Sequence, residues 1–219
     1  MEVGMDKKDI PISAIIMAQN EEKYISKAVE NLMPNVAEVI VVDGGSTDKT
    51  VEICKELGCR VDIHPFAYDF AHQRNYAMTL CKTPWILFCD ADEWFSEEFF
   101  GLLPTLIADA KDCFGYHIHR ISKFDGQVVG KDFQWRVLHR TGGHWEGKVH
   151  EGFTFDRGKR GLKVPEQYAM FHEHTMKRQL YNNALYYNIN NDIKERPADD
   201  KGMQYETDRW IVVPTGRDE

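Results

Sequence analysis

Acidic and amide side chains follow three buried, strand-like segments of the sequence. Asn20 comes just after Ser13–Ala18, Glu38–Asp43 ends on an aspartate, and Trp85–Cys89 runs directly into Asp90–Asp92. Any one of these groups alone could be a helix cap or a turn former. Together they predict a ligand crevice, because ligands of open α/β sheets bind beyond the carboxyl ends of the strands.

The Asp-Ala-Asp sequence at residues 90–92 predicts a site for a divalent cation. Two carboxylates spaced in this way on a loop can both approach one hard cation, and the small Ala91 lets the backbone come close. Mg²⁺ or Mn²⁺ prefers oxygen ligands and commonly shares them with substrate phosphates. We therefore expect a Mn²⁺ or Mg²⁺ cofactor and a phosphate-bearing ligand.

An alternation of strands and helices positions these groups in the first part of the chain. Apolar residues recur at helical spacing before Pro34, at Ile25, Ala28, Val29 and Leu32. The other expected elements before residue 90 are a helix ending at Gly58, a strand at Arg60–His64 and a helix at Asp69–Leu80. Strands separated by helices indicate an α/β fold with a mostly parallel sheet flanked by helices.

After Cys89 the pattern changes to a smaller antiparallel addition. An Asp125-Gly126 turn signal separates two expected strands, and Phe133, Trp135 and Val137 should share one strand face. The other expected elements are a helix at Ser96–Ala110 broken near Pro104, strands at Tyr116–Ile121 and Phe133–Arg140, a loop at Thr141–Gly152, and a helix at Lys177–Lys194 with Leu180, Ala184 and Tyr187 on one side. We divide the chain into an α/β half (1–110), a second half of the same domain (111–194) and a polar tail (195–219).

Composition limits the classes of function. The chain has 219 residues, 42% of them hydrophobic, and a net charge of -8, which disfavours non-specific binding to nucleic acid. A bound cation would still allow a phosphate ligand. Five cysteines without a C-x-x-C pair and no apolar run of about 18 residues suggest a cytoplasmic protein, and leave a peripheral membrane contact open.

The order of motifs resembles glycosyltransferase family 2 with its GT-A fold. The similar runs are ISAIIMAQNEE, EVIVVDGGSTDKT, DFAHQRNYAM and PWILFCDADE, which span about the first hundred residues. The later WEGKVHEGF and FHEH are similar to a bacterial subgroup that glycosylates lipopolysaccharide cores or peptides. The resemblance implies transfer of a sugar from a UDP-sugar, or a related nucleotide sugar, with inversion. It also implies that residues 1–110 are a nucleotide-sugar-binding half and residues 111–194 an acceptor-side half of the same domain. The acceptor and the oligomeric state stay open.

The resemblance also implies roles for individual residues. The residues expected to bind the nucleotide or ribose are Ala18, Asn20, Asp43, Arg74 and Asp90. Asp92 would be the direct metal ligand, with Asp90 in or near the metal shell. Two positions depart from the family pattern: Gly44 stands where many members have a second aspartate, and Ala18 where they have proline.

Seven of the nine histidines follow residue 115, which suggests a function in the second half. His172 matches the position at which GT-A enzymes often return a late histidine to the metal, with His174 and His150 as competitors. Inversion also needs a carboxylate near the acceptor hydroxyl. We prefer Glu151 as this base over Glu146, both in the glycine-flexed loop.

Further candidates belong to the same region. Asp132 and Asp156 are the next candidates for the base, and Trp145 with Trp135 would make a platform for a sugar ring, although core packing suits Trp135 equally well. The alternatives to a glycosyltransferase are a non-catalytic nucleotide-sugar-binding protein and a nucleotidyltransferase. A nucleotidyltransferase would carry a glycine-rich phosphate loop after the first strand, and this chain has none there. A glycosidase fits least, because its carboxylates would face each other across a sugar cleft.

Overall fold

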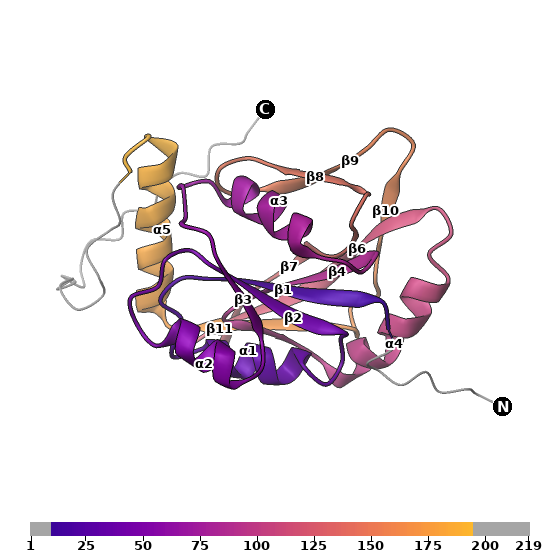
Figure 1. The fold of residues 1–219 in the computed structure, drawn as a ribbon, viewed down its shortest axis with the longest axis horizontal. Helices are drawn as coiled ribbons and strands as arrows, with labels where there is room; N and C mark the ends of the chain where they lie inside the picture. Colours follow the sequence, from indigo (N-terminus) through magenta and orange to yellow (C-terminus); the bar gives the residue numbers. More distant parts are fainter. Residues whose placement is uncertain (1–9, 195–219) are drawn as a thin grey trace.

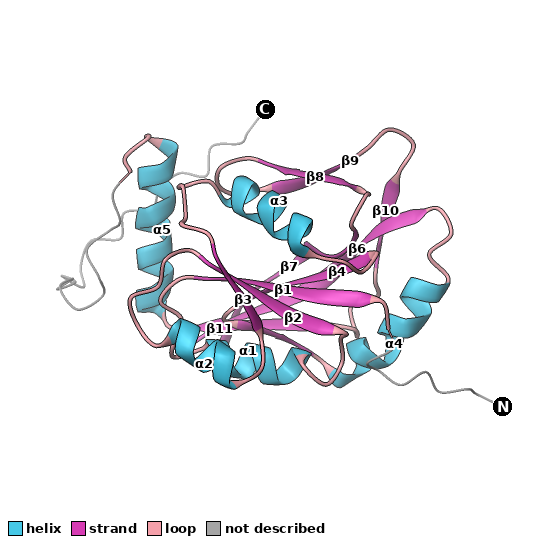
Figure 2. Ribbon diagram, viewed as in Figure 1, coloured by secondary structure: helices cyan, strands magenta, loops and turns pink. Residues whose placement is uncertain are grey.

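A mixed nine-stranded sheet forms the centre of the protein, in a computed structural model that describes residues 10–194. The strand order is β3-β2-β1-β4-β7-β6-β11-β5, and β10 pairs with β6. A second sheet consists of β8 and β9 (Figure 2). The expected α/β class is confirmed, and the expected tail at 195–219 lies outside the described residues.

The elements run along the chain as follows. The strands are β1 (Ile12–Ala18), β2 (Glu38–Asp43), β3 (Arg60–Ile63), β4 (Trp85–Asp90), β5 (Glu93–Phe95), β6 (Cys113–Phe124), β7 (Gln127–His139), β8 (Gly143–Glu146), β9 (Gly152–Phe155), β10 (Arg160–Lys163) and β11 (Met170–His174). The helices are α1 (Ile25–Leu32), α2 (Thr50–Glu56), α3 (Phe70–Leu80), α4 (Glu97–Ala108) and α5 (Met176–Asn190).

The first four strands pair in parallel, as their buried apolar runs predict. β1 lies between β2 and β4, and β3 pairs with the outer side of β2. Their carboxyl ends therefore meet at one edge, and in Figure 1 α5 stands beside the sheet at one end rather than over a face. Ala18 and Asp43 are register partners at the ends of β1 and β2.

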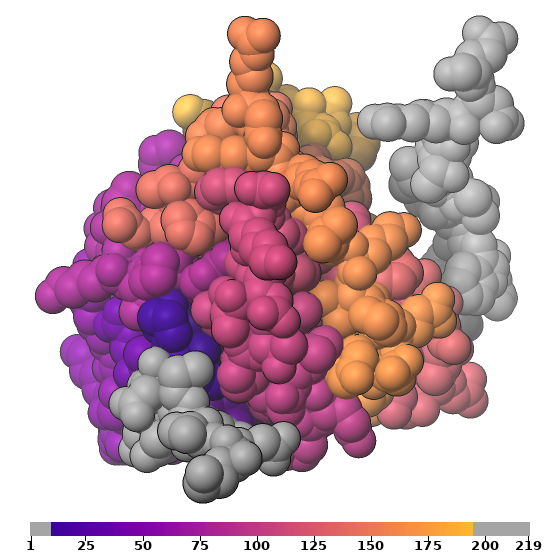
Figure 3. Space-filling model, turned by 90° about the vertical axis from the view of Figure 1, so that its right-hand side faces the viewer, coloured from indigo at the N-terminus to yellow at the C-terminus, as the bar shows by residue number. Residues whose placement is uncertain are grey.

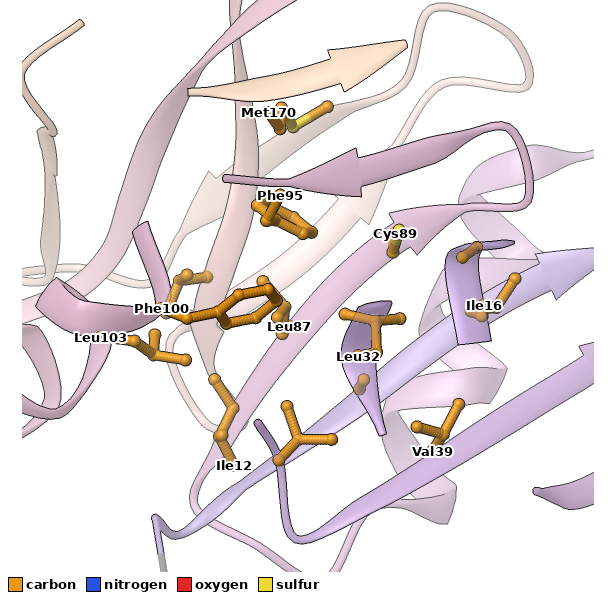
Figure 4. Close-up of a cluster of buried hydrophobic side chains, with 14 of the residues drawn as sticks. Ile12, Ile16, Leu32, Val39, Leu87, Cys89, Phe95, Phe100, Leu103 and Met170 are labelled. Atoms are coloured by element: carbon orange, nitrogen blue, oxygen red, sulfur yellow. The ribbon is translucent and has the colours of Figure 1, made fainter. Parts of the chain in front are cut away.

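Two apolar clusters cover the two faces of the sheet. Ile12, Ala14 and Ile16 of β1 point into one cluster, while Ile15 points into the other. Helices α1, α2 and α4 cover the first face, and α3 with the β8–β9 hairpin covers the second (Figure 1). Figure 4 shows the first cluster, in which Met170 of β11 packs with residues of β1, β4 and α4. The two halves of the chain thus share one core.

The β6–β7 hairpin carries the expected turn. Asp125 and Gly126 both have positive φ, 49° and 81°, as a two-residue type I′ turn requires. Both strands are longer than expected, since β6 runs over Cys113–Phe124 and β7 over Gln127–His139. A long β6 allows β10 and β11 to pair along its outer edge.

A bulge in β7 contradicts the prediction that Phe133, Trp135 and Val137 share a face. Tyr116 of β6 pairs with Val137 but the next residue pairs with Trp135, so Arg136 is the extra residue. Val137 consequently joins the first cluster, whereas Trp135 packs against the second. A bulge re-aims one side chain, and here it turns Arg136 toward β4.

Three other expectations were wrong in part. Helix α4 continues through Pro104 without the predicted break. The segment Thr141–Gly152, which we had expected to be a loop, contains β8. On α5 the buried residues are Leu185 and Ile189, while Leu180 and Tyr187, which we had expected to lie with Ala184 on the helix's apolar side, are exposed.

The outer surface also brings together segments from the middle and from the later part of the chain. In the space-filling view, magenta residues from the middle of the chain lie next to orange residues from its later part (Figure 3). All five cysteines are buried and unpaired, as expected. Among residues 10–194, no helix has the length and apolar character needed to cross a membrane.

Candidate active site

The loops after β1 and β2 are tied together through Asn20. Its side-chain Oδ1 accepts a hydrogen bond from the Thr47 backbone N–H at 2.8 Å, and its own N–H donates to Ser46 Oγ at 2.9 Å. Asn20 has a φ of 60°, a conformation that asparagine tolerates better than most residues. The expected nucleoside residues Ala18, Asn20 and Asp43 therefore lie together at one edge of the sheet.

Asp43 organises the turn that follows β2. Its Oδ2 accepts from the backbone N–H groups of Gly45 and Ser46, both at 2.9 Å, and its Oδ1 accepts from Ser46 Oγ. The structure also explains Gly44, where many family members have aspartate. A Cβ at this position would lie 3.0 Å from Gln19 Oε1 and 3.2 Å from Phe66 Cβ.

Seven charged residues form a continuous series of ion pairs between α3, β4 and the β6–β7 hairpin, which we name the ion-pair chain. In order, its members are Glu151, Arg74, Asp90, Arg136, Glu93, Arg120 and Asp132. Each arginine contacts two carboxylates. This arrangement fixes Arg74 and Asp90, two of the expected nucleotide residues, next to each other.

Asp90 lies between two arginines of this ion-pair chain. Its Oδ1 accepts from Arg74 Nη2 at 3.2 Å and its Oδ2 from Arg136 Nη2 at 2.9 Å. Burial opposes the charge, but Arg136 and Arg74 outweigh it and hold the pKa of Asp90 below its usual value. The two oxygens of Asp90 thus face arginines, while Asp92 faces histidines.

Asp92 meets two histidines of β11. Its Oδ2 lies 3.3 Å from His172 Nε2 and 3.3 Å from His174 Nδ1, and the two ring nitrogens are 2.8 Å apart. The Asp92 side chain is 11% exposed. Burial opposes its ionisation, but His172, His174 and Arg178 hold the pKa of Asp92 well below its usual value. We name these three residues the Asp92 triad.

The surrounding hydrogen bonds suit a metal at the Asp92 triad. Gln179 Oε1 lies 2.9 Å from His174 Nε2 and holds the ring so that Nδ1 faces Asp92. Ser122 Oγ lies 3.3 Å from Nδ1 of His172, so Nε2 of that ring also faces Asp92. Neighbours of this kind commonly orient metal-binding histidines. Adjacent ligands around an octahedral cation with bonds of about 2.1 Å are about 3 Å apart, close to the separations here.

The two proposed bases occupy different environments. Glu151 Oε1 accepts from Arg74 Nε at 2.6 Å, and its side chain is 14% exposed, so it belongs to the ion-pair chain. Glu146 is 62% exposed, and its carboxylate contacts His144 and Thr154 on the β8–β9 hairpin. Only Glu151 is thus brought into contact with the other expected site residues.

Trp145 cannot serve as an exposed sugar platform, because it is 4% exposed. It packs edge to face against Phe88, and the Arg74 guanidinium lies 4.8 Å from its ring centroid. Trp135 stacks on His117 at a centroid distance of 3.8 Å. Both tryptophans therefore support the site by packing.

Helix α5 covers the site edge of the sheet. Tyr186 is close enough to Asp90, Glu151 and Asp92 that their charges add to its burial, and its pKa is raised to about 12. Near the start of the helix, Arg178 Nη2 donates to Glu21 Oε1 in the loop after β1. Burial outweighs this ion pair and raises the pKa of Glu21 to about 7.

A cavity of about 390 Å³ opens beside the Asp92 triad on the α1 side. Its lining includes Lys23, Tyr24, Lys27, Asp92, Trp94 and His174. Lys27 Nζ lies 3.0 Å from the Trp94 ring centroid. Asn20, Asp43 and Arg74 do not line this cavity, so it is distinct from the place where the expected nucleotide residues meet.

The sequence analysis assigned no individual role to five residues of this site: Glu21, Glu93, Arg120, Arg136 and Arg178. A partial signal existed for the histidines, since residues i and i+2 of a strand point to the same face. We had treated His172 and His174 as competitors, yet this periodicity predicts that both point to one place. His150 lies elsewhere, with its ring 5.3 Å from that of Tyr186.

Comparison with known proteins decides the family. The profile of glycosyl transferase family 2 matches residues 13–183. The chain belongs to glycosyltransferase family 2. The resemblance inferred from the motifs is thereby confirmed, and it extends well beyond the first hundred residues.

Named relatives of this family 2 chain include two bacterial or phage enzymes. The lipopolysaccharide core biosynthesis glycosyltransferase LpsC of Rhizobium meliloti is 31% identical over 159 residues, covering 66% of this chain and 57% of LpsC. The glycosyltransferase SunS of Bacillus phage SPbeta is 35% identical over 154 residues, covering 68% of this chain and 36% of SunS. An uncharacterized glycosyltransferase of Rickettsia bellii is 45% identical over 87 residues, covering 40% of this chain and 29% of that protein. The chain therefore spans little more than half of LpsC and less of the others.

Solved structures confirm the GT-A type fold of this family 2 chain. Glucosyl-3-phosphoglycerate synthase from Mycobacterium tuberculosis, in complex with Mn²⁺, UDP and glucosyl-3-phosphoglycerate, has a TM-score of 0.57 at 17% identity, covering 84% of this chain and 78% of that one. S. aureus TarS 1-349 in complex with UDP-GlcNAc has a TM-score of 0.52 at 14% identity, covering 87% and 68%. At these identities the similarity concerns the fold.

Proposed function

We propose that this family 2 protein is an inverting, metal-dependent glycosyltransferase that moves a sugar from a UDP-sugar, or a related nucleotide sugar, to an acceptor hydroxyl. The observation that carries the proposal is the Asp92 triad at the carboxyl end of β4, next to the ion-pair chain. Two neighbours in fold were solved with UDP or UDP-GlcNAc, and one of them also with Mn²⁺.

Asp92, His172 and His174 would hold the cation, Mn²⁺ or Mg²⁺. Asp90 would act indirectly, because both of its oxygens already contact arginines. A bound divalent cation would supply positive charge to the leaving diphosphate. The mixed oxygen and nitrogen ligands of the triad favour Mn²⁺ over Mg²⁺, which prefers oxygen alone.

The nucleoside would lie across the ends of β1 and β2. Ala18 would give it a small apolar wall, and Asn20 with Asp43 would hold the surrounding loops in shape and contact the base or ribose. Arg74 would approach the nucleotide from α3, where its position over Trp145 is fixed by Asp90 and Glu151.

Glu151 would act as the general base. The acceptor oxygen attacks the anomeric carbon, the bond from that carbon to the diphosphate oxygen breaks, and the hydroxyl proton moves to the Glu151 carboxylate. The hydrogen bond that Arg74 Nε donates to Glu151 Oε1 orients this carboxylate. Residues 1–110 would then bind the donor and residues 111–194 the acceptor, a division that stays a prediction.

The test is a panel of nucleotide sugars with UDP release as readout, with Mn²⁺ and with chelator. Water serves as the default acceptor, so the acceptor need not be known. We expect Mn²⁺-dependent release by the wild type and its loss in Asp92→Ala. Asp112→Ala is the matched control, because Asp112 is an exposed aspartate in the turn before β6, away from the triad.

Equal UDP release with and without Mn²⁺, or full release by Asp92→Ala, would contradict the metal assignment. UDP binding in Mn²⁺ without release from any sugar, with or without candidate acceptors, would favour the non-catalytic binding protein instead.

A further inference from the structure

Two facing side chains beside the Asp92 triad are buried without using all of their hydrogen-bonding atoms. Arg178 of α5 and Glu21 of the β1 loop form an ion pair, with side chains 24% and 8% exposed. Within residues 10–194, Glu21 Oε2 and Arg178 Nε have no hydrogen-bond partner. Buried polar atoms without partners are costly, so these two atoms call for an explanation.

Arg178 also differs from the other arginines of the site. Arg74, Arg120 and Arg136 each contact two carboxylates, whereas the ion pair of Arg178 is with Glu21. Arg178 also lies near enough to Asp92 to stabilise its ionised form. Arg74 Nη1 likewise has no hydrogen-bond partner among residues 10–194, but Arg74 is paired with two carboxylates and Arg178 with one, so Arg178 is the arginine of this site whose charge is least compensated by ion pairs.

We propose that Arg178 binds the diphosphate of the donor, and that Glu21 occupies this arginine when no donor is bound. The inference rests on the proposed function and names an exchange within that site. Phosphate oxygens would replace a carboxylate on the same guanidinium, and Glu21 would act as a built-in competitor of the donor.

Geometry and chemistry support this exchange. A planar guanidinium binds phosphate through two parallel N–H donors, and the unpartnered Nε is one such donor on Arg178. A diphosphate that shared a cation with the Asp92 triad would also come close to Arg178. Burial raises the pKa of Glu21 to about 7, so its carboxylate is a poorly solvated partner that is easily displaced.

The experiment measures affinity for two probes, UDP and inorganic pyrophosphate, each with Mn²⁺, by calorimetry. Arg178→Met should weaken both probes at least about tenfold, because a charge-assisted hydrogen bond pair to phosphate is lost. Glu21→Gln should tighten both by about threefold or more, since the neutral amide is isosteric but competes poorly.

Lys148→Met provides a matched control. Lys148 pairs with Asp192 at 2.6 Å near the other end of α5, so this variant removes a cation and a helix contact away from the triad. Its affinity for both probes should stay within about twofold of the wild type. Thermal melting of all four proteins distinguishes loss of binding from loss of fold.

The outcomes separate this inference from the proposed function. If the wild type binds UDP and releases it from a sugar donor but Glu21→Gln binds no more tightly, the exchange is wrong and the function stands. If pyrophosphate binding follows the expected order but no nucleotide sugar is used, the exchange stands and the function is wrong. If Arg178→Met folds and keeps wild-type affinity for both probes, or if the wild type binds neither, the inference is overturned.

Discussion

The pH dependence of stability gives a direct measure of the buried Glu21 carboxyl. Burial raises its pKa from 4.5 to about 7, against the opposing effect of Arg178. The protonated form is therefore favoured in the folded state. Its contribution to the free energy of unfolding is fully present below about pH 4.5 and is lost as the pH rises through about 7.

The magnitude follows from the shift. One pKa unit corresponds to about 1.4 kcal/mol, so a shift of this size is worth about 3 kcal/mol in total, of which about 2 to 3 kcal/mol falls between pH 5 and pH 8. Glu21→Gln cannot ionise at this position. The variant should therefore gain about 2 to 3 kcal/mol relative to the wild type between those two pH values.

Urea denaturation at pH 5, 6, 7 and 8 measures this difference, provided that the slope with urea is the same for both proteins. Glu56→Gln removes the same charge at an exposed position and should not reproduce the effect. A difference between wild type and Glu21→Gln that stayed constant from pH 5 to pH 8 would refute the reasoning. It would mean that Arg178 keeps Glu21 ionised in the folded protein at every pH tested.

Two further predictions concern the base and the packing around β7. Glu151→Gln should keep near-normal UDP affinity and lower turnover at least about a hundredfold, while Glu146→Gln has a smaller effect; steady-state rates in the reverse order would identify Glu146 as the base. Gly161→Ala should lower the free energy of unfolding by about 1 to 3 kcal/mol, because a Cβ there would lie 2.4 Å from the Trp135 ring. Urea midpoints test this against Gly101→Ala, where no atom lies within 4 Å of the added Cβ, and equal midpoints would contradict it.

The first half of the fold could be predicted from local pattern. Buried apolar runs gave β1, β2 and β4 nearly to the residue, and helical spacing gave the buried face of α1. Parallel strands have their carboxyl ends at one edge, so the residues that follow them had to meet. The sequence was informative here because hydrophobic periodicity and strand direction alone decide which residues are buried and at which edge the strands end.

The second half of the fold depends on contacts that a local pattern does not contain. The strands β5, β9, β10 and β11 are only three to five residues long, and they exist because other strands offer them hydrogen-bonding partners: β6 pairs with β10 and β11, β8 with β9, and β11 with β5. The bulge at Arg136 is set by pairing register, which one strand alone does not determine. Glu93 and Arg136 were missed for this reason, since their ion pair joins β5 to β7.

The charges around the site explain how an acidic chain can suit a phosphate ligand. Six carboxylates and four arginines meet there, so the ionised cluster lacks two positive charges. Five of these carboxylates have an arginine partner, whereas the ion pairs of Asp92 are with two histidines. One of the two missing charges belongs to the ion-pair chain, which has four carboxylates and three arginines, and the other belongs to Asp92, so a divalent cation bound at the Asp92 triad would balance both. The net charge of -8 repels phosphate at long range, but salt screens the repulsion from distant charges. The cation and Arg178 would act at contact distance, where their attraction is screened much less.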